Sequence, residues 1–384
     1  MTESRTPPPD LVPSLRKQAR SLGFDLFGIA PAVSPLGFHR LIQWVDAGYA
    51  AEMNYFADRI DAYGDPGKVL DGAASIIVLT YPYPYSDDAS PPPASRPSAR
   101  IARYARIAAD YHDVIHPLLK QLKQTIFQAC PAALSRGVVD TAPLMEREFA
   151  SLAGLGWAGK NSLLLNKNRG SYFFLASILT TLVLPYDQPQ ETAHCGTCTR
   201  CLDACPTDAF AAPGVVDSRR CISYLTIEHR GPIPLQFRTS IGDRLFGCDI
   251  CQEVCPWNDR AERLKKLGSD ANESADPAGR IDLIDLLSMD DAAFRVAFRH
   301  TPMWRPRRRG LLRNAAICAG NAKDQRSAEV LCRLLSDAEP LIRGAAAWAL
   351  GQLGGRQDAL AKQLAVELDS EVRKEIESAL GLSN

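Results

Sequence analysis

The sequence predicts three consecutive parts: an α/β domain, a cysteine-rich domain of ferredoxin type with little regular structure, and a C-terminal α-solenoid. Helical and strand-like patterns alternate up to about residue 186. Eight of the eleven cysteines lie between Cys195 and Cys255, and a helical repeat follows. The length of 384 residues suits two or three domains of roughly 100–200 residues each. We expect the parts at 1–186, 187–267 and 280–384, with the polar stretch 268–279 as a linker.

The prediction of an α/β domain depends on four segments. LVPSLRKQARSLGF and DVIHPLLKQLKQTIFQA have the apolar spacing of amphipathic helices. ASIIVLTYPY is typical of a buried strand, and SYFFLASILTTLVL, rich in aromatic and β-branched residues, predicts a strand or a strand pair. The chain contains no GxxxxGK[ST] string, so a P-loop is excluded.

The overall composition restricts the class of protein without identifying it. With 46% hydrophobic and 23% charged residues, the chain should fold as a globular protein. Its 44 basic and 44 acidic residues cancel, so any surface for nucleic acid must be a local basic cluster. No apolar stretch follows the charged N-terminal residues, and 172–184 is too short to span a membrane. We therefore expect a cytoplasmic protein that does not bind membranes.

The cysteines form a pattern that is specific for iron–sulfur clusters. Cys195, Cys198, Cys201 and Cys205, followed by proline, have the CxxCxxCxxxCP spacing of bacterial ferredoxins, in which the fourth cysteine binds the other cluster. A second set consists of Cys221 and, after an insertion, a CxxCxxxCP run. Crossed ligation then assigns one 4Fe–4S cluster to Cys195, Cys198, Cys201 and Cys255, and another to Cys205, Cys221, Cys248 and Cys251.

Two structural zinc sites with four cysteines each are the alternative to these clusters. Zinc ribbons pair two CxxC units and lack the CxxCxxCxxxCP run, so the spacing favours 4Fe–4S clusters. Two neighbouring clusters form a path for electrons, which implies a redox centre at its end.

The C-terminal repeat is marked by Arg313, Arg343 and Arg373, spaced by 30 residues. Each begins a similar phrase: RNAAICAG, RGAAAWALG and RKEIESALG. Alanine-rich helices at this period predict a short solenoid of HEAT type, and a plain helical bundle is the alternative.

Several strings together resemble one family. CGTCTRCLDACPTDAF, CISYLTIE, GCDICQEVCPWN, VVDTAPLMERE and GWAGKNSLLL are similar to the epoxyqueuosine reductases, from about residue 10 to the C-terminus. The resemblance implies reduction of epoxyqueuosine to queuosine at the wobble position of tRNA, the last step of queuosine synthesis. It also implies cobalamin beside the two clusters, a tRNA anticodon stem-loop as partner and an external low-potential electron donor. The alternatives are a corrinoid reductase of the reductive dehalogenase type acting on a small molecule, and a non-catalytic electron carrier.

The resemblance also implies roles for particular residues. Asp140, in VVDTAP, matches the proton donor, although an aspartate before a proline-containing turn is also a common helix N-cap. The nearest string to the cobalt-binding DxHxxG motif is DYH at 110–112, which lacks the glycine, so cobalt should have no histidine ligand. The implied corrin contacts are Tyr63, where relatives tend to carry a basic residue, Asp140, Lys160, Asn161, Leu164, Leu175, Ser223 and Asp249.

The densest basic stretch is HTPMWRPRRRGLLR at 300–313, which also contains Trp304. Arginine pairs with phosphate and an aromatic side chain can stack on an unpaired base, so the stretch predicts a tRNA-binding surface, with a solvated loop as the alternative. A second patch lies in the insertion between Cys221 and Cys248. The predicted tRNA contacts are Arg230, Arg238, Arg305, Arg307, Arg308 and Arg313.

Overall fold

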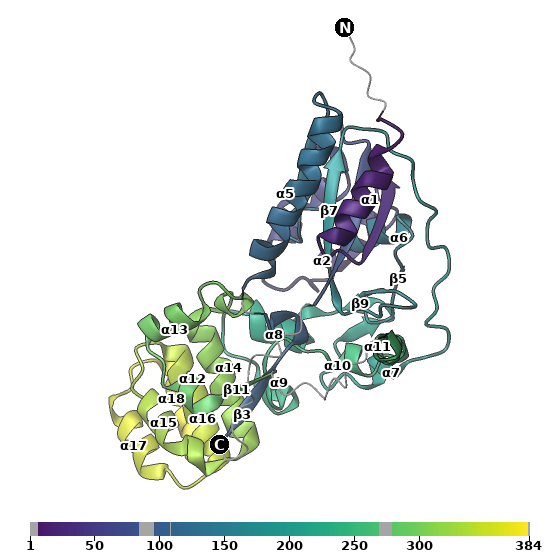
Figure 1. Ribbon diagram of the computed structural model, residues 1–384. Coiled ribbons are helices and arrows are strands. Elements are labelled where there is room, and N and C mark those ends of the chain that lie inside the picture. The colour runs from purple at the N-terminus through teal and green to yellow at the C-terminus, as the bar shows by residue number, and fades with distance from the viewer. Residues whose placement is uncertain (1–6, 84–95, 108, 269–278, 383–384) are drawn as a thin grey trace.

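The computed structural model describes residues 7–83, 96–107, 109–268 and 279–382. The predicted linker at 268–279 lies, except for its two end residues, outside the described residues. In Figure 1 the α/β part is at the top, the C-terminal helices are at the lower left, and the cysteine-rich segment lies below and to the right of the α/β part. None of the helices in the described ranges is long and apolar enough to cross a bilayer.

A four-stranded antiparallel sheet forms the centre of the α/β part. Its order is β1 (Leu26–Pro31), β2 (Ser75–Pro82), β7 (Phe173–Thr180) and β4 (Ser135–Val138). The predicted strand in 74–83 is confirmed, and 171–184 forms one strand and not a pair. Most residues of β2 and β7 are buried on both faces, which explains why these segments are nearly continuous apolar runs.

Helices cover both faces of this sheet, and both predicted helices are confirmed. α1 (Leu11–Ser21) and α5 (Tyr111–Ala129) share one apolar cluster with the sheet, and α6 (Glu146–Leu152) packs in another cluster on the other face. Asp110 caps α5 by accepting the His112 backbone N–H at 3.0 Å. The helix therefore begins with Tyr111 and His112, two side chains that reach Asp140, two residues after the end of β4.

The cysteine-rich segment consists of short elements between ligand positions. They are α7 (Arg200–Asp203), β8 (Phe210–Ala212), β9 (Val215–Val216), α8 (Ile222–Ile227), α9 (Leu235–Ile241), β10 (Arg244–Phe246), α10 (Ile250–Glu253) and α11 (Pro256–Gly268). The insertion between Cys221 and Cys248 contains α8, α9 and β10. The Gly247 N–H donates to Thr226 Oγ1 at 3.0 Å, which ties the end of the insertion back to α8.

A second, three-stranded sheet joins distant segments of the chain. Its order is β10, β3 (Ser98–Ile101) and β11 (Arg280–Asp282), with β10 parallel and β11 antiparallel to β3. One buried apolar cluster continues from this sheet through α8 and α9 into the C-terminal helices. The cysteine-rich segment and the C-terminal helices thus share a hydrophobic core.

The C-terminal part is helical, as predicted, and its repeat helices stack. The helices are α12 (Leu283–Leu287), α13 (Asp291–Phe298), α14 (Arg307–Ala322), α15 (Ala328–Leu334), α16 (Pro340–Leu353), α17 (Gln357–Val366) and α18 (Ser370–Ala379). α14, α16 and α18, which contain the three repeated phrases, pack side by side. The repeated arginines bond to neighbouring backbone: Arg343 donates to the Asp337 carbonyl at 2.9 Å and Arg373 to the Leu364 carbonyl at 2.9 Å.

Candidate active site

Asp140 lies in the bend after β4, with a left-handed backbone angle φ of 45°. Aspartate tolerates this conformation better than most residues that carry a side chain. Its backbone N–H donates to Glu146 Oε1 at 3.0 Å, and α6 begins only at Glu146. The N-cap of α6 is Met145, so the interpretation of Asp140 as a helix cap is wrong.

The Asp140 carboxylate contacts two side chains from the first turn of α5. The Tyr111 hydroxyl donates to Oδ2, and His112 Nε2 lies 2.8 Å from Oδ1. His112 Nδ1 lies 2.7 Å from Asp110 Oδ1, so the imidazole bridges two carboxylates. The Asp140 side chain remains 42% exposed, which leaves it accessible to a substrate.

His112 holds a proton at neutral pH. Burial lowers its pKa, but the hydrogen bonds to Asp110 and Asp140 outweigh burial and raise the pKa to about 9. Burial and the charge of Asp140 raise the pKa of Tyr111 far above its usual range, so the phenol remains protonated. The environment of Asp140 is therefore polar, and both side chains that contact its carboxylate carry protons.

Tyr111 and His112 are the site residues that sequence reasoning missed. The string DYH was judged only against a cobalt-binding motif. The available signal was Asp110 as an N-cap, because a cap places the next two residues in the first turn of a helix.

Glu146 supports Asp140 from the other side. Burial, followed by the charge of Asp140, raises the pKa of Glu146 to about 8. Its neighbour Arg147 donates to the Ser162 carbonyl, and Glu148 Oε1 accepts the Gly37 N–H at 2.9 Å. The first three residues of α6 thus each form a hydrogen bond to a different loop, those of Asp140, Ser162 and Gly37.

Tyr63 lies beside the Asp140 loop. Burial and the charges of Glu146 and Asp140 raise the pKa of its phenol, partly offset by Arg59. Its ring stacks on Phe56, with centroids 5.5 Å apart, and Phe56 contacts Trp44 edge-on. An aromatic wall therefore borders the site where Tyr63 was predicted to contact the cofactor.

The other predicted corrin contacts come from separate segments of the chain. Leu164, on β6 (Leu164–Leu165), and Leu175, on β7, belong to the same apolar cluster. Asp249 is buried before α10 and accepts the Arg103 N–H at 2.7 Å, and Ser223 lies on α8. Asn161 does not bond to Asp140 or to either leucine: its Nδ2 donates to the Cys251 carbonyl at 3.3 Å.

The eight cysteines of the motif are free thiols that gather in two groups. Burial raises the pKa of Cys201 and of Cys255, and the neighbours that raise each pKa further come from the same predicted ligand set. The same holds for Cys221, next to Cys205, and for Cys248, whose pKa rises to about 12 next to Cys221. Burial and the charges of Cys248, Cys221 and Cys201 raise the pKa of Cys251, so the two groups lie near each other.

The spacing within these groups does not suit a single metal ion. Within the described ranges, no three His, Cys, Asp or Glu side chains converge closely enough to chelate one ion. The four cysteines of a cubane bind four different iron atoms, so they lie farther apart than the four ligands of one zinc ion.

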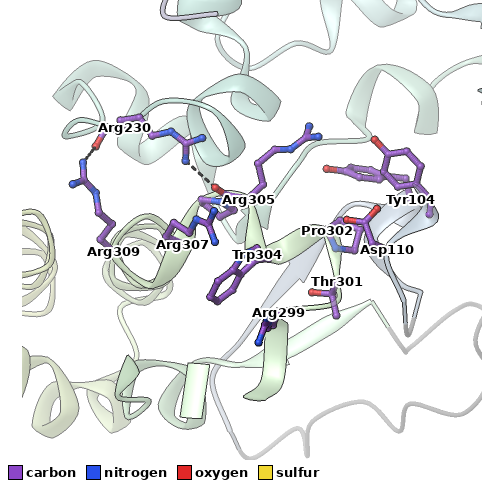
Figure 2. Close-up of a pocket in the computed structure, with 12 residues that line it drawn as sticks. Tyr104, Asp110, Arg230, Arg299, Thr301, Pro302, Trp304, Arg305, Arg307 and Arg309 are labelled. Atoms are coloured by element: carbon purple, nitrogen blue, oxygen red, sulfur yellow. Dashed lines mark hydrogen bonds between the residues drawn. The ribbon is translucent and has the colours of Figure 1, made fainter. Parts of the chain in front are cut away.

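A basic pocket of about 650 Å³ borders the Asp140 site. Figure 2 shows its arginines, which come from the cysteine-rich segment and from the region around the start of α14. Asp110 and Tyr111 line the same pocket. Its arginines are Arg230, Arg299, Arg305, Arg307 and Arg309.

Hydrogen bonds hold this arginine cluster in place. Arg309 donates to the Arg230 carbonyl at 2.9 Å, and Arg230 donates to the Arg305 carbonyl at 2.8 Å (Figure 2). Burial lowers the pKa of Arg305, but nearby Tyr111, Glu228 and Asp140 outweigh it and raise the pKa, which indicates that this cation faces the Asp140 site. Sequence reasoning did not select Arg299 or Arg309 as contacts.

Three predicted tRNA contacts are wrong because their side chains bond inside the protein. Arg313 is 1% exposed and donates to the carbonyls of Leu225 and Gly231. Burial, with Arg230 and Arg309 nearby, lowers the pKa of Arg313 to about 9. The other two pair with carboxylates at 2.6 Å, Arg308 with Asp337 and Arg238 with Glu375.

Trp304 is also less available for stacking on a base than its sequence context suggests. Phe294 stacks on it, with centroids 5.6 Å apart and an angle of 25° between the planes. The Arg307 guanidinium lies 4.5 Å from the centroid of the same ring. A base could stack there only if Arg307 moved.

Comparison with protein families gives three matches along the chain. Residues 64–141 match the family described as "Epoxyqueuosine reductase QueG, DUF1730". Residues 194–258 match a 4Fe-4S double cluster binding domain, and residues 308–381 match HEAT repeats. The prediction of two iron–sulfur clusters and of a HEAT-type C-terminal part is confirmed.

Whole-chain relatives give the same result. The chain is 38% identical to the epoxyqueuosine reductase of Pseudomonas aeruginosa, over 90% of this chain and 96% of that protein. It is 34% identical to the epoxyqueuosine reductase of Escherichia coli, over 96% and 97%. These two relatives are similar to the chain over almost its full length.

Solved structures are equally similar in fold. An epoxyqueuosine reductase with a tRNA-Tyr epoxyqueuosine-modified stem loop superposes with a TM-score of 0.87 and 33% identity, covering 97% of this chain and 98% of that chain. The Bacillus subtilis enzyme, solved with its catalytic loop swung out of the active site, superposes with a TM-score of 0.85 and 32% identity, covering 98% and 99%.

Proposed function

The chain belongs to the epoxyqueuosine reductase family, and from this premise we propose how its own residues carry out the reaction. The enzyme reduces epoxyqueuosine in tRNA to queuosine. The epoxide oxygen leaves as water and a carbon–carbon double bond forms, which requires two electrons and two protons. The proposal therefore has to assign a source of protons, a path for electrons and a surface for RNA.

We assign the protons to Asp140 and its partners on α5. Both protons that leave with the epoxide oxygen as water reach it through the exposed Asp140 carboxyl group. The first is the proton shared between His112 and Asp140, and solvent water at this exposed carboxyl group supplies the second. The supporting observation is the distance of 2.8 Å between His112 Nε2 and Asp140 Oδ1, and the pKa of His112, raised to about 9 by its two carboxylate partners, agrees with a proton held there at neutral pH. The Tyr111 hydroxyl orients the carboxyl group through Oδ2.

Electrons enter from a low-potential donor outside the chain and pass through the two clusters. Thiolates, not thiols, bind iron, so cluster assembly displaces the protons that burial favours on these cysteines. The adjacency of Cys201 and Cys251 supports transfer between the two clusters.

We propose cobalamin as the group that receives these electrons next to the substrate. Both His112 nitrogens are engaged by carboxylates, so this histidine has no free lone pair for cobalt, which fits a cofactor without a histidine ligand. Among the described residues the buried Tyr172 hydroxyl has no hydrogen-bond partner, and it lies near Arg103 and Asp249, so it is available to bond to an amide of the corrin periphery. Cobalamin would supply a strongly reducing metal. Tyr63, Leu164, Leu175, Ser223 and Asp249 would hold it.

The basic pocket is the proposed site for the RNA next to the substrate base. Its arginines pair with phosphates, and their position beside Asp110 and Tyr111 brings the wobble nucleotide to Asp140. The substrate base has to leave the anticodon stack to reach the carboxyl group. The partner we propose is thus the anticodon stem-loop, and the reaction takes place in the cytoplasm, where tRNA is modified.

The variant Asp140→Asn tests the role of the proton donor. It keeps the size of the side chain but removes its acidity, so turnover should fall by about 10²–10⁴-fold. Mass spectrometry of nucleosides from treated tRNA measures the product, and iron content and the visible spectrum check the cofactors. Asp61→Asn, at an exposed carboxylate 3.7 Å from Lys68, is the control. Wild-type turnover in Asp140→Asn would contradict the proposal.

A further inference from the structure

Lys160 lies in a tight turn that touches the first cysteine loop. The turn joins β5 (Trp157–Ala158) to β6 and is closed by the Gly159 N–H donating to the Leu163 carbonyl at 2.8 Å. The Lys160 ammonium donates to the carbonyls of Gly196 at 2.7 Å and Cys198 at 3.0 Å. A positive charge is thereby fixed on the loop that carries three ligands of one cluster.

Two further bonds prevent the turn from moving away from the clusters. The Lys160 carbonyl accepts the Gly214 N–H at 2.8 Å, and Asn161 Nδ2 donates to the Cys251 carbonyl at 3.3 Å. Within the described part of the chain, no carboxylate forms an ion pair with Lys160. Its charge is therefore not neutralised by a neighbouring side chain, and its position relative to the cysteine loop is fixed.

We propose that Lys160 is a positioning cation that raises the reduction potential of the cluster bound by Cys195, Cys198, Cys201 and Cys255. A cubane with four thiolates carries a net negative charge, which grows by one unit on reduction. A fixed cation nearby stabilises the more negative, reduced form, and partial burial weakens solvent screening of this attraction. The inference depends on the proposed cluster ligands, and it adds a function for a side chain that was expected to contact the corrin.

The effect on the reaction concerns the entry of electrons. An external donor reduces a cluster only if the reduction potential of the cluster is not too far below the reduction potential of the donor. With Lys160 in place, a larger fraction of this cluster is reduced at a given potential of the donor. The second cluster, bound by cysteines that Lys160 does not contact, serves as an internal reference in the same molecule.

The experiment is a redox titration of anaerobically reconstituted protein, followed by the EPR signals of both clusters. Lys160→Gln removes the charge but keeps a hydrogen-bond donor for the two carbonyls. At a fixed potential the ratio of reduced to oxidised cluster should fall about tenfold, which corresponds to about 59 mV for a one-electron couple. Lys160→Arg, which keeps the charge, should titrate like the wild type.

Arg200→Gln is the matched control for loss of charge. Arg200 lies on α7 between Cys198 and Cys201, but it is exposed, so water screens its charge and its removal should leave the midpoint almost unchanged. The inference is overturned if Lys160→Gln has full iron content and unchanged midpoints, or if Arg200→Gln causes the same shift. Reduction of epoxyqueuosine in tRNA by the wild type is measured separately, so failure of this inference and failure of the proposed function can be distinguished.

Discussion

His112 is held between two carboxylates, and this position gives the protein a pH dependence whose sign follows from the pKa. An ordinary histidine has a pKa of about 6.5, whereas that of His112 in the folded chain is about 9. The folded state therefore retains the proton over a range of pH in which the unfolded chain loses it. The resulting stability is fully present below about pH 6.5 and is lost as the pH rises through 9.

The first prediction concerns this histidine. Between pH 6.5 and 9 the free energy of unfolding of the wild type should decrease by about 1–2 kcal/mol, after allowance for the partial exposure of the ring. His112→Gln, which cannot take up a proton, should lack this part of the decrease. Urea unfolding at a series of pH values gives the free energy of unfolding of both proteins. The same dependence of this free energy on pH in the two proteins would contradict the raised pKa of His112. Turnover of the wild type should also fall above about pH 9.

Glu146 gives a second prediction at the same scale. Its Oε1 accepts the Asp140 N–H, and this bond helps hold the left-handed bend at Asp140. Glu146→Ala loses this hydrogen bond, which stabilises the bend by about 1 kcal/mol. The bend at Asp140 should then be formed in a smaller fraction of the molecules, and kcat should fall about fivefold. Glu146→Gln keeps an acceptor oxygen and should retain most of the activity. Equal kcat values for the two variants would exclude this role.

At the scale of single elements, α14 shows why some functional residues could be predicted and others could not. The sequence shows that the region from 305 to 313 is rich in arginine, but not which side chains point outward. Arg313 also belongs to the 30-residue series with Arg343 and Arg373, and this periodicity was the signal for a structural role. Arg308 faces Asp337, a partner 29 residues away that only the fold brings close.

The residues of the candidate active site could also be predicted only in part. The cysteine pattern indicated the clusters, because ligand spacing is a local property of the chain. The contact of α5 with Asp140 depends on how a helix packs beside the end of a strand, which no local pattern encodes. The strands β2 and β7 were recognisable because burial on both faces requires continuous apolar runs.

The third prediction separates the outward-facing arginines of α14 from other surface charges. Arg307→Ala combined with Arg309→Ala removes two cations from the basic pocket, so the slope of log affinity for tRNA against log salt should flatten by about 1–2. The control pair, Arg326→Ala with Arg333→Ala, removes two exposed charges outside the pocket and should leave the slope unchanged. Identical slopes for the two double variants would contradict a role of the pocket in RNA binding.

For the whole molecule, the most consequential feature is the core shared by the cysteine-rich segment and the C-terminal helices. Leu245 and Phe246 on β10 are fully buried in the cluster that includes α14, and Asn314 Nδ2 donates to the Leu245 carbonyl at 3.0 Å. The insertion that brings Cys221 to Cys248 is thus supported from the C-terminal side. HEAT repeats often form separate units, but here their first helix, α14, completes the hydrophobic core next to the segment between Cys221 and Cys248.

The fourth prediction follows from this shared core. A chain ending after Gly268 exposes β10 and α9, so the segment between Cys221 and Cys248 should not fold, and iron content should fall to roughly half of the full complement. Co-expression of residues 279–384 as a separate chain should restore part of it. Iron analysis and EPR of the two preparations provide the measurement, and a truncated chain with both clusters intact would disprove the dependence.

The sheet formed by β10, β3 and β11 determines how relatives with different RNA preferences could be recombined. Each of its strands comes from a different part of the chain, and β3 lies in the middle. A chimaera joined at residue 279 would keep β3 and β10 from one parent and take β11 and all later helices from the other. The crossover would then cut through a hydrogen-bonded sheet, and its two halves would have to match in backbone register and in the ion pairs of Arg100 and Arg280 with Asp243. A functional exchange therefore has to carry residues 98–101 and 244–246 together with the helices, as a discontinuous cassette.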